Sequence, residues 1–405
     1  MSSDIIKRII DLAARADPYP VYAELYDRPV VEADNGTFVV GGYDDVWSLL
    51  HDWRLSSDPS NQTGYVPSAM DFPLMLTVDA PQHDTLRRLA TKAFGPPCAP
   101  GLVLEQEPSV VATIDELIGA FGPGQADVVD ELAYPLPVSA ICRLLGVPRE
   151  DEPQFRAWGK ALIGGLDQLG GVEDQGLVEA RDSALMAMFG YLSELIARLR
   201  EHPDGSMFAR LALDQDQEHL DDVELAANGI LLLVAGHEST VNQTANGMLT
   251  LLRWPEQLAM LRSRPERMAQ VTEELLRFEP PLQYLPDRFA LEDIELGGTT
   301  ITKGSAVALM LAAANRDPRR FDHPDVFDPD RPDNQHLSFG GGIHYCFGAP
   351  LARIEIYRAL GALVGRLVNP RLLEDPPPYR TSPVLRGPLH LRIAYDGVLG
   401  PEASL

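Results

Sequence analysis

The chain has 405 residues, and its 59 acidic side chains outnumber the 34 lysines and arginines, which gives a formal net charge of −25. This charge excludes a protein that binds nucleic acid or an anionic membrane through a dominant basic face. Because no apolar stretch is long enough to span a bilayer, no secretory signal is visible at the start, and three cysteines cannot form a disulfide framework, we expect a cytoplasmic protein.

The first predicted elements are a hairpin and a helix. Residues 29–40 predict a hairpin around Asn35-Gly36, a dipeptide that favours a two-residue turn. Residues 185–199 place apolar side chains three and four positions apart, which predicts an amphipathic helix.

A long helix follows in the middle of the chain. Asp221 and Glu224 form the pattern of a capping box, and the helix that it opens extends to about Arg253, on the order of 50 Å. Residues 230–235 are apolar on all sides, so this helix is expected to run through the core. A further helix is predicted within residues 265–278, with a proline in its first turn.

Strand signals are fewer and occur in separate places. Residues 294–311 predict strands broken at two glycine-containing turns, and residues 389–395 alternate like a terminal strand. Residues 315–338 show neither helical nor strand periodicity, and loops of this length are usually functional or disordered. With no linker and no internal repeat, we expect one domain over residues 1–405, mainly α with small β-sheets (α+β).

Cys346 is the cysteine that needs a chemical explanation. Cys98 lies between prolines and Cys142 in an apolar run, so both are expected to be structural. Cys346 instead follows the glycine-rich residues 339–342 and precedes the periodic run 351–367. A glycine-rich loop that feeds a helix start brings backbone N–H groups and the helix dipole close to the sulfur, and both stabilise a thiolate.

Three kinds of site are compatible with this thiolate. For zinc, His336, His344 and Cys346 lack a second closely spaced pair of ligands. For a redox thiol, no resolving cysteine lies nearby. Ligation of a haem iron requires only one cysteine in a tight loop. The residues alone leave these alternatives open.

The full string FGGGIHYCFG, residues 339–348, resembles the cysteine-ligand loop of the cytochrome P450 family. That loop has Phe, two residues, Gly, three residues, Cys, one residue and Gly, and the continuation APLAR resembles the soluble bacterial branch. The resemblance implies the P450 fold, with a long central helix across the haem and Cys346 as the iron ligand. Because no Cys-x-x-Cys-His motif occurs, haem b without covalent links is expected.

Other segments match family motifs in the same order. Glu274 and Arg277 match a Glu-x-x-Arg pair that, in the family, locks onto the proline-rich segment, here expected through Arg331. Glu355 and Arg358 satisfy the same spacing, but their position fits less well.

The resemblance also assigns residues to the cofactor. His83 and Arg87, on a helix expected to start at Asp79, match a His-x-x-x-Arg motif that binds a haem propionate, and Arg288 and His344 match further propionate ligands. The complete expected set is His83, Arg87, Ala235, Gly236, Ser239, Arg288, Ser338, Phe339, Gly340, His344, Cys346, Gly348 and Ala352.

Residues 235–240, AGHEST, resemble the oxygen-activating segment of the family. Ala235 and Gly236 would leave room for the porphyrin and O₂, while Glu238 and Ser239 would relay protons. The expected catalytic residues are Glu238, Ser239 and Thr240. The family usually has Thr where Ser239 stands, and Thr240 points about 100° away, so it cannot simply replace Ser239. The alternative is a structural role, in which the hydroxyl bonds back to the carbonyl four residues earlier.

The resemblance implies a haem-thiolate monooxygenase that inserts one atom of O₂ into a small or medium hydrophobic molecule. Phenol coupling, peroxide-driven oxidation and a non-enzymatic haem or gas sensor are the alternatives. Because no flavin or iron–sulfur segment is recognisable, a ferredoxin and its reductase would supply electrons. The expected docking cations are Arg88, Lys92, Arg353 and Arg358.

The substrate pocket is expected to be mostly apolar, with Gln283 and Tyr284 as polar contacts and residues 154–200 as its roof. Its lining would come from residues 64–74, Leu231, Leu232, Ala235, residues 282–285 and residues 384–385.

Overall fold

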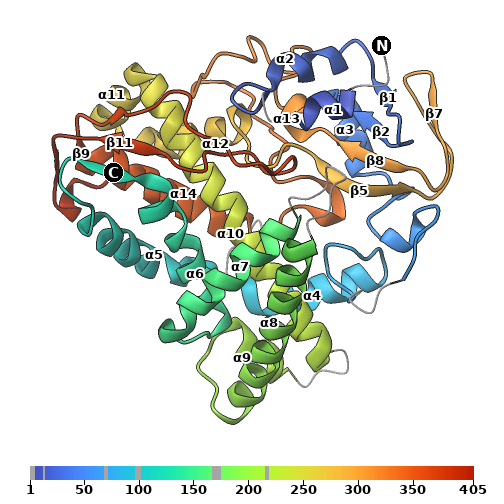
Figure 1. Cartoon of the computed structure of the whole chain (residues 1–405), viewed down its shortest axis with the longest axis horizontal. Coiled ribbons are helices and arrows are strands. Elements are labelled where there is room, and N and C mark those ends of the chain that lie inside the picture. Colours follow the sequence, from blue (N-terminus) through green and yellow to red (C-terminus); the bar gives the residue numbers. More distant parts are fainter. Residues whose placement is uncertain (1–4, 12–13, 68–71, 96–101, 167–174, 215–218) are drawn as a thin grey trace.

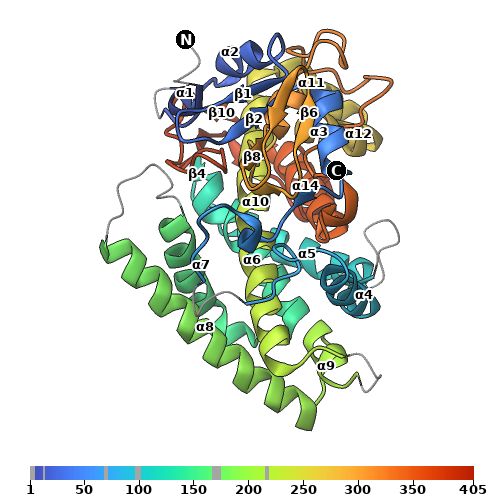
Figure 2. The same ribbon diagram turned by 90° about the vertical axis from the view of Figure 1, so that its right-hand side faces the viewer.

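The computed structural model describes residues 5–11, 14–67, 72–95, 102–166, 175–214 and 219–405, so Cys98 lies outside the described residues. The chain forms a helical part and a part rich in strands, with α10 (Asp222–Arg253) passing from one to the other (Figures 1 and 2). The fold class is confirmed, because helices dominate and the sheets are small and separate. None of the described helices combines the length and the apolar character that a membrane span requires.

The predicted long helix is confirmed, including its start. The Asp221 carboxylate accepts a hydrogen bond from the Glu224 N–H at 2.7 Å, and the Glu224 carboxylate accepts one from the Asp221 N–H at 3.1 Å. These bonds satisfy two groups that an open helix end would leave unpaired. The helix packs against α6 (Pro135–Leu145), α8 (Gln175–Glu201) and α14 (Ala349–Arg366).

The other described helices of six or more residues lie in both parts of the fold. They are α3 (Tyr43–Leu50), α4 (Gln82–Phe94), α5 (Leu102–Gly119), α7 (Glu152–Leu166), α9 (Met207–Ala212), α11 (Pro255–Ser263) and α12 (Met268–Phe278). Three short helices, α1 (Ile5–Ile9), α2 (Tyr19–Tyr22) and α13 (Leu311–Ala314), lie beside the largest sheet (Figure 1). The predicted helix over 185–199 is part of α8, which begins ten residues earlier at Gln175.

The largest sheet has the strand order β1-β2-β8-β5-β3. Its strands are β1 (Val30–Glu32), β2 (Phe38–Val40), β3 (Leu55–Ser56), β5 (Leu285–Ala290) and β8 (Ala306–Leu309). The predicted hairpin is confirmed, since Val30 pairs with Val40 and Gly36 adopts a φ of +79° in the turn. The pairing of β5 with β8 shifts register between Leu285 and Arg288, and such an irregularity changes the direction of the side chains that follow it.

The small sheets use short strands. They are β4 (Gln125–Asp127), β6 (Ile294–Leu296), β7 (Thr299–Ile301), β9 (Leu367–Val368), β10 (Arg371–Leu372), β11 (Arg392–Ala394) and β12 (Gly397–Val398). The predicted terminal strand over 389–395 is therefore too long. The side chain of His390 and the N–H of Leu391 both hydrogen-bond the Asp127 carboxylate, which takes them out of the β11 ladder.

Glu274 and Arg277 hold the irregular segment 315–338, as the resemblance implies. Both side chains are fully buried and form two hydrogen bonds of 2.8 and 2.6 Å. Arg277 also donates to the carbonyls of Asn315 and Pro324 at 2.9 Å, and Arg331 approaches Glu274 at 3.5 Å. This network supplies the hydrogen bonds that a segment without helix or strand would otherwise lack.

Candidate haem-thiolate site

Cys346 lies in a tight loop between Phe339 and the start of α14. Its N–H donates to the Phe339 carbonyl at 2.9 Å, which closes the loop. Gly340 and Gly342 adopt φ angles of +67° and +63°, a backbone region that favours glycine. A Cβ on Gly342 would lie 2.1 Å from the Leu50 carbonyl oxygen, so a side chain at this position would push α3 away from the loop.

Two opposing effects act on the Cys346 thiol. Burial raises its pKa, while the N–H of Gly348, the charge of Arg87 and the N–H of Ala349 act in the opposite direction. The sulfur is therefore surrounded by groups that stabilise an anion, in a place where an unliganded thiol stays protonated. A metal ion at the sulfur would shift the balance to the thiolate.

Cys346 does not belong to a cluster of metal-binding side chains. Within the described part of the chain, one group of three such residues converges, and it consists of Asp127, Asp130 and His390. His336 hydrogen-bonds Glu273 at 3.1 Å instead of approaching the sulfur. Cys142 is fully buried, and burial raises its pKa to about 12, as expected for a structural cysteine. This geometry argues against the zinc and dithiol alternatives.

The four expected propionate ligands converge from three segments. The rings of His83 on α4 and His344 in the loop meet edge to face, with centroids 4.4 Å apart. Burial and the charges of Arg288, His83 and Arg87 lower the pKa of His344 to about 3. The buried Nε2 atoms of His83 and His344 find no hydrogen-bond partner among the described residues. These donors and cations would suit a carboxylate.

The middle of α10 exposes one face. Most of the helix is buried, but Leu231, Leu232, Ala235, Gly236 and Ser239 keep exposed surface. Their three- and four-residue spacing places them on one side of the helix. Ala235, at the centre of this open face, carries only a methyl group, which leaves room beside the helix.

The acid and the alcohols of α10 point in different directions. The Ser239 hydroxyl donates to the Ala235 carbonyl at 3.1 Å on the open face, whereas buried Thr240 donates to Gly236 at 3.3 Å. Both hydroxyls therefore make the backbone bond of the structural alternative. Buried Glu238 meets Arg380 at 2.6 Å. A proton relay would need the Ser239 hydroxyl to give up its bond to the Ala235 carbonyl.

The rest of the expected cofactor set lines the loop. Arg87 donates to the Tyr345 carbonyl at 2.7 Å, and Arg353 stacks on the Phe339 ring at 4.4 Å. Gly348 precedes the first turn of α14, and the N–H of Ala352 donates to its carbonyl at 3.0 Å. The Ser338 hydroxyl donates to the Leu276 carbonyl at 2.6 Å and accepts from Asn315, so it holds the loop onto α12.

Two expectations about contacts, those for Asp79 and Gln283, need correction. The Asp79 carboxylate does not cap α4, because it accepts hydrogen bonds from Ser56 and Ser57 beside β3. Gln283 is fully buried and bonds Tyr22 and Pro280, which leaves its amide no group for a substrate. Tyr284 packs against the cluster of the N-terminal helices.

The expected docking cations are mostly neutralised within the chain. Lys92 pairs with Asp214 at 3.1 Å, Arg353 with Glu273 at 2.6 Å, and Arg358 with Glu107 at 2.5 Å. Because Arg358 pairs with Glu107, it does not pair with Glu355, the other member of the second Glu-x-x-Arg match. Burial raises the pKa of Glu355 to about 8, and its Oε1 has no hydrogen-bond partner among the described residues.

The sequence did not point to Arg380 or Asn228. Arg380 reaches Glu238 from a proline-rich segment 142 residues further along the chain. Asn228 bonds the backbone of Pro73 and Met75. The only available signal for Asn228 was a polar residue in an otherwise apolar stretch of the long helix.

These observations fit a bound haem. Cys346 in its loop is flanked by N–H donors. The buried Nε2 atoms of His83 and His344, near Arg87 and Arg288, have no hydrogen-bond partner among the described residues. Helix α10 presents a face with small residues. Each is a requirement of a thiolate-ligated porphyrin with two carboxylates.

Comparisons with known proteins agree with this geometry. The model of the cytochrome P450 family matches residues 178–388. Vitamin D(3) 25-hydroxylase of Pseudonocardia autotrophica is 36% identical over 96% of this chain and 95% of its own length. The 6-deoxyerythronolide B hydroxylase of Saccharopolyspora erythraea is 35% identical over 94% of this chain and 96% of its own. The ligand-free structure of CYP164A2 from Mycobacterium smegmatis has a TM-score of 0.87 at 37% identity, covering 96% of this chain and 99% of that one.

Proposed function

The chain belongs to the cytochrome P450 family and is a cytochrome P450 monooxygenase of the bacterial type, and from this premise we propose that it inserts one atom of O₂ into a hydrophobic small molecule. It would do so as a single domain in the cytoplasm. The observation that carries the proposal is the closed loop around Cys346, in which backbone N–H groups and Arg87 favour a thiolate.

The family implies a haem cofactor, and we propose haem b, held by Cys346 and by His83, Arg87, Arg288 and His344. The cofactor, when bound, supplies the activation of dioxygen. The chain would contribute the axial thiolate, donors for the two propionates, and a helix face on which Ala235 exposes a single methyl group. The unpartnered Nε2 atoms of the two histidines support this assignment.

Glu238 and Ser239 would deliver protons at the open face of α10. Ser239 carries a hydroxyl on that face, and its bond to the Ala235 carbonyl could be exchanged for one to a water molecule. Glu238 is held by Arg380, so we propose that this contact positions the carboxylate for proton transfer. Thr240 would have no part in the relay, because its hydroxyl is buried.

The proposed substrate is hydrophobic. The open face of α10 offers Leu231, Leu232 and Ala235, and Gln283, one of the two polar side chains expected near it, is buried and donates to the Pro280 carbonyl. The two relatives above carry names of different substrates at nearly the same identity. Identity at this level therefore does not select a substrate for this chain.

A ferredoxin and its reductase would supply the electrons. Because Lys92, Arg353 and Arg358 pair with carboxylates, any electrostatic attraction to an acidic ferredoxin would be weaker than the four cations alone suggest. Reversing the charge of Arg88 by Arg88→Glu should slow ferredoxin-dependent reduction and flatten its salt dependence. Unchanged reduction kinetics at low salt would remove Arg88 from the docking surface.

The absorption spectrum of the protein, reduced with dithionite and exposed to carbon monoxide, tests the proposal. A strongly red-shifted Soret band in the native protein, lost in Cys346→Ser, is the expected result. Haem with an ordinary carbonyl spectrum would contradict Cys346 as the ligand. Incorporation of ¹⁸O from labelled O₂ into product would then separate oxygen insertion from phenol coupling, which leaves no label in the product.

A further inference from the structure

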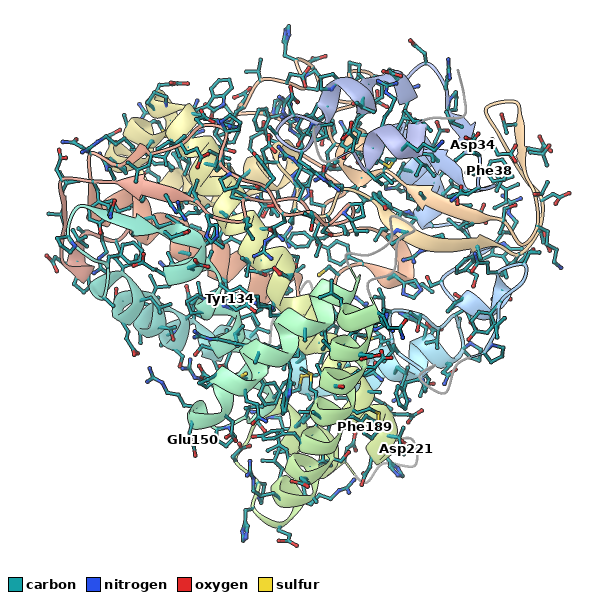
Figure 3. All side chains as sticks on the ribbon, viewed as in Figure 1. Asp34, Phe38, Tyr134, Glu150, Phe189 and Asp221 are labelled. Carbon is teal, nitrogen blue, oxygen red and sulfur yellow. The ribbon has the colours of Figure 1, made fainter. Side chains whose placement is uncertain are left out.

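Residues 72–75 form a short strap that touches the roof helix α8, the central helix α10 and the cysteine loop. The strap has no helix or strand of its own. At one end, the ring of Phe72 stacks on Phe189 of α8, with centroids 5.3 Å apart and planes inclined by 13°. Phe189 is labelled in Figure 3, on the helix that runs beside the start of α10.

Asn228 of α10 holds the backbone of the strap. Its Oδ1 accepts a hydrogen bond from the Met75 N–H at 2.8 Å, and its Nδ2 donates to the Pro73 carbonyl at 3.2 Å. The same nitrogen donates to the Glu224 carbonyl at 2.9 Å, which fixes the rotamer against its own helix. The side chain is 8% exposed, so these bonds are shielded from water.

Met75 also contacts the cysteine loop. The His344 ring hydrogen-bonds the Met75 backbone, and this ring lies edge to face with His83. The backbone of one residue, Met75, therefore connects Asn228 on α10 with a proposed propionate ligand. A shift of the strap would therefore change both the contact with Asn228 and the position of the His344 ring.

Asn228 also lies in line with the open face of α10. Ala235 follows it by seven residues, which is two turns of helix, so both side chains leave the same side about 10 Å apart along the axis. Leu231 and Leu232 lie between them. The strap consequently borders the open face at the end away from Ser239.

We propose that Asn228 is a positioning residue that sets the length of hydrophobic substrate the enzyme accepts, by holding residues 72–75 at the far end of the open face. This inference rests on the proposed monooxygenase function and adds a determinant of specificity to it. Asn228 contacts neither the reacting atoms nor the cofactor. Its effect is transmitted through the strap.

The test compares holoenzyme variants with two readouts. Asn228→Leu keeps the side-chain volume and removes all three bonds, whereas Asn228→Asp keeps the acceptor for Met75 and loses the donor for Pro73. Asn246→Leu is the matched control, because Asn246 is a buried asparagine of the same helix that donates to the Arg386 carbonyl at 3.0 Å. The probes are imidazole and 1-alkylimidazoles of increasing chain length, with binding followed by the Soret shift.

In Asn228→Leu, hydrogen exchange at the Met75 amide should become about 10- to 100-fold faster, as the loss of buried bonds predicts. The chain length that binds most tightly should change, with affinities for long chains altered about 10-fold and that for imidazole within about twofold. Asn228→Asp should show a smaller effect on exchange, and Asn246→Leu should leave both readouts at the strap unchanged. If Asn228→Leu fails to fold, Asn228→Asp carries the test.

Unchanged exchange at Met75 and an unchanged order of alkylimidazole affinities in a folded Asn228 variant would overturn the inference. An equal loss of affinity for imidazole and for every chain length would also overturn it, because it would indicate general damage. Failure of the proposed function is distinguishable. It would appear as a native protein without a thiolate-type carbonyl spectrum, while the exchange readout still reports on the Asn228 contact.

Discussion

The contact between Glu238 and Arg380 allows a quantitative test of how the proposed relay acid is held. We expect Arg380→Met, which keeps much of the side-chain length and removes the charge, to lower the free energy of unfolding. The two side chains are 5% and 16% exposed, and their closest atoms are 2.6 Å apart. Charges about 4 Å apart attract by about 4 kcal/mol at an effective dielectric constant of about 20.

Removing one member of a buried pair typically costs about 3–5 kcal/mol, because the remaining charge is stranded. Since Arg380 keeps some contact with water, we expect a loss of about 3 kcal/mol at pH about 8. The double variant Arg380→Met/Glu238→Gln should recover about 2 kcal/mol of it, since no charge remains buried.

Urea unfolding of the four proteins in this cycle measures the coupling energy directly. The control is Arg371→Met, which breaks an ion pair with Asp396 at 2.8 Å. These side chains are 58% and 51% exposed, so the change in the free energy of unfolding should be small. A coupling energy between Glu238 and Arg380 no larger than this control would refute the reasoning. In the holoenzyme, Glu238→Gln should slow oxygen consumption about 100-fold or more, and Arg380→Met, which keeps the acid, should slow it far less.

Three further predictions concern other parts of the site. His83→Phe keeps the ring and removes its donor, so transfer of haem to apomyoglobin should become about 10- to 100-fold faster, and an unchanged rate would remove His83 from the propionate ligands. Because the pKa of Glu355 is raised to about 8, the native protein loses stability as the pH rises from about 4.5 towards 8. In urea unfolding, the free energy of unfolding of Glu355→Gln should therefore exceed that of the native protein by roughly 2–4 kcal/mol at pH about 8 and by little at pH about 5. A difference that does not depend on pH would contradict this. Gly342→Ala should cost about 2 kcal/mol or more in thermal unfolding, because a Cβ would meet the Leu50 carbonyl at a positive φ, and an unaffected melting temperature would mean that the loop has room.

Elements specified by local rules could be predicted from the sequence. The capping box at Asp221 and the turn at Asn35-Gly36 each involve residues within four positions of one another, and both are confirmed. The terminal strand was predicted too long because its ends depend on Asp127, a residue more than 260 positions away. Alternation shows which residues can extend, but only a neighbouring strand decides how many of them pair.

The site likewise combines features set by neighbouring residues with features set by distant ones. The loop around Cys346 is one continuous string, so its spacing was visible. The partners of Glu238 and of Met75, in contrast, come from segments more than 140 residues distant, and neither Arg380 nor Asn228 carries a local pattern. The loop that holds Cys346 is therefore local and visible in the sequence, whereas the contact that holds Glu238 and those that shape the substrate end arise from tertiary packing. Specificity can consequently change by substitution at positions such as Asn228 without touching any motif, which is consistent with relatives of nearly equal identity carrying names of different substrates.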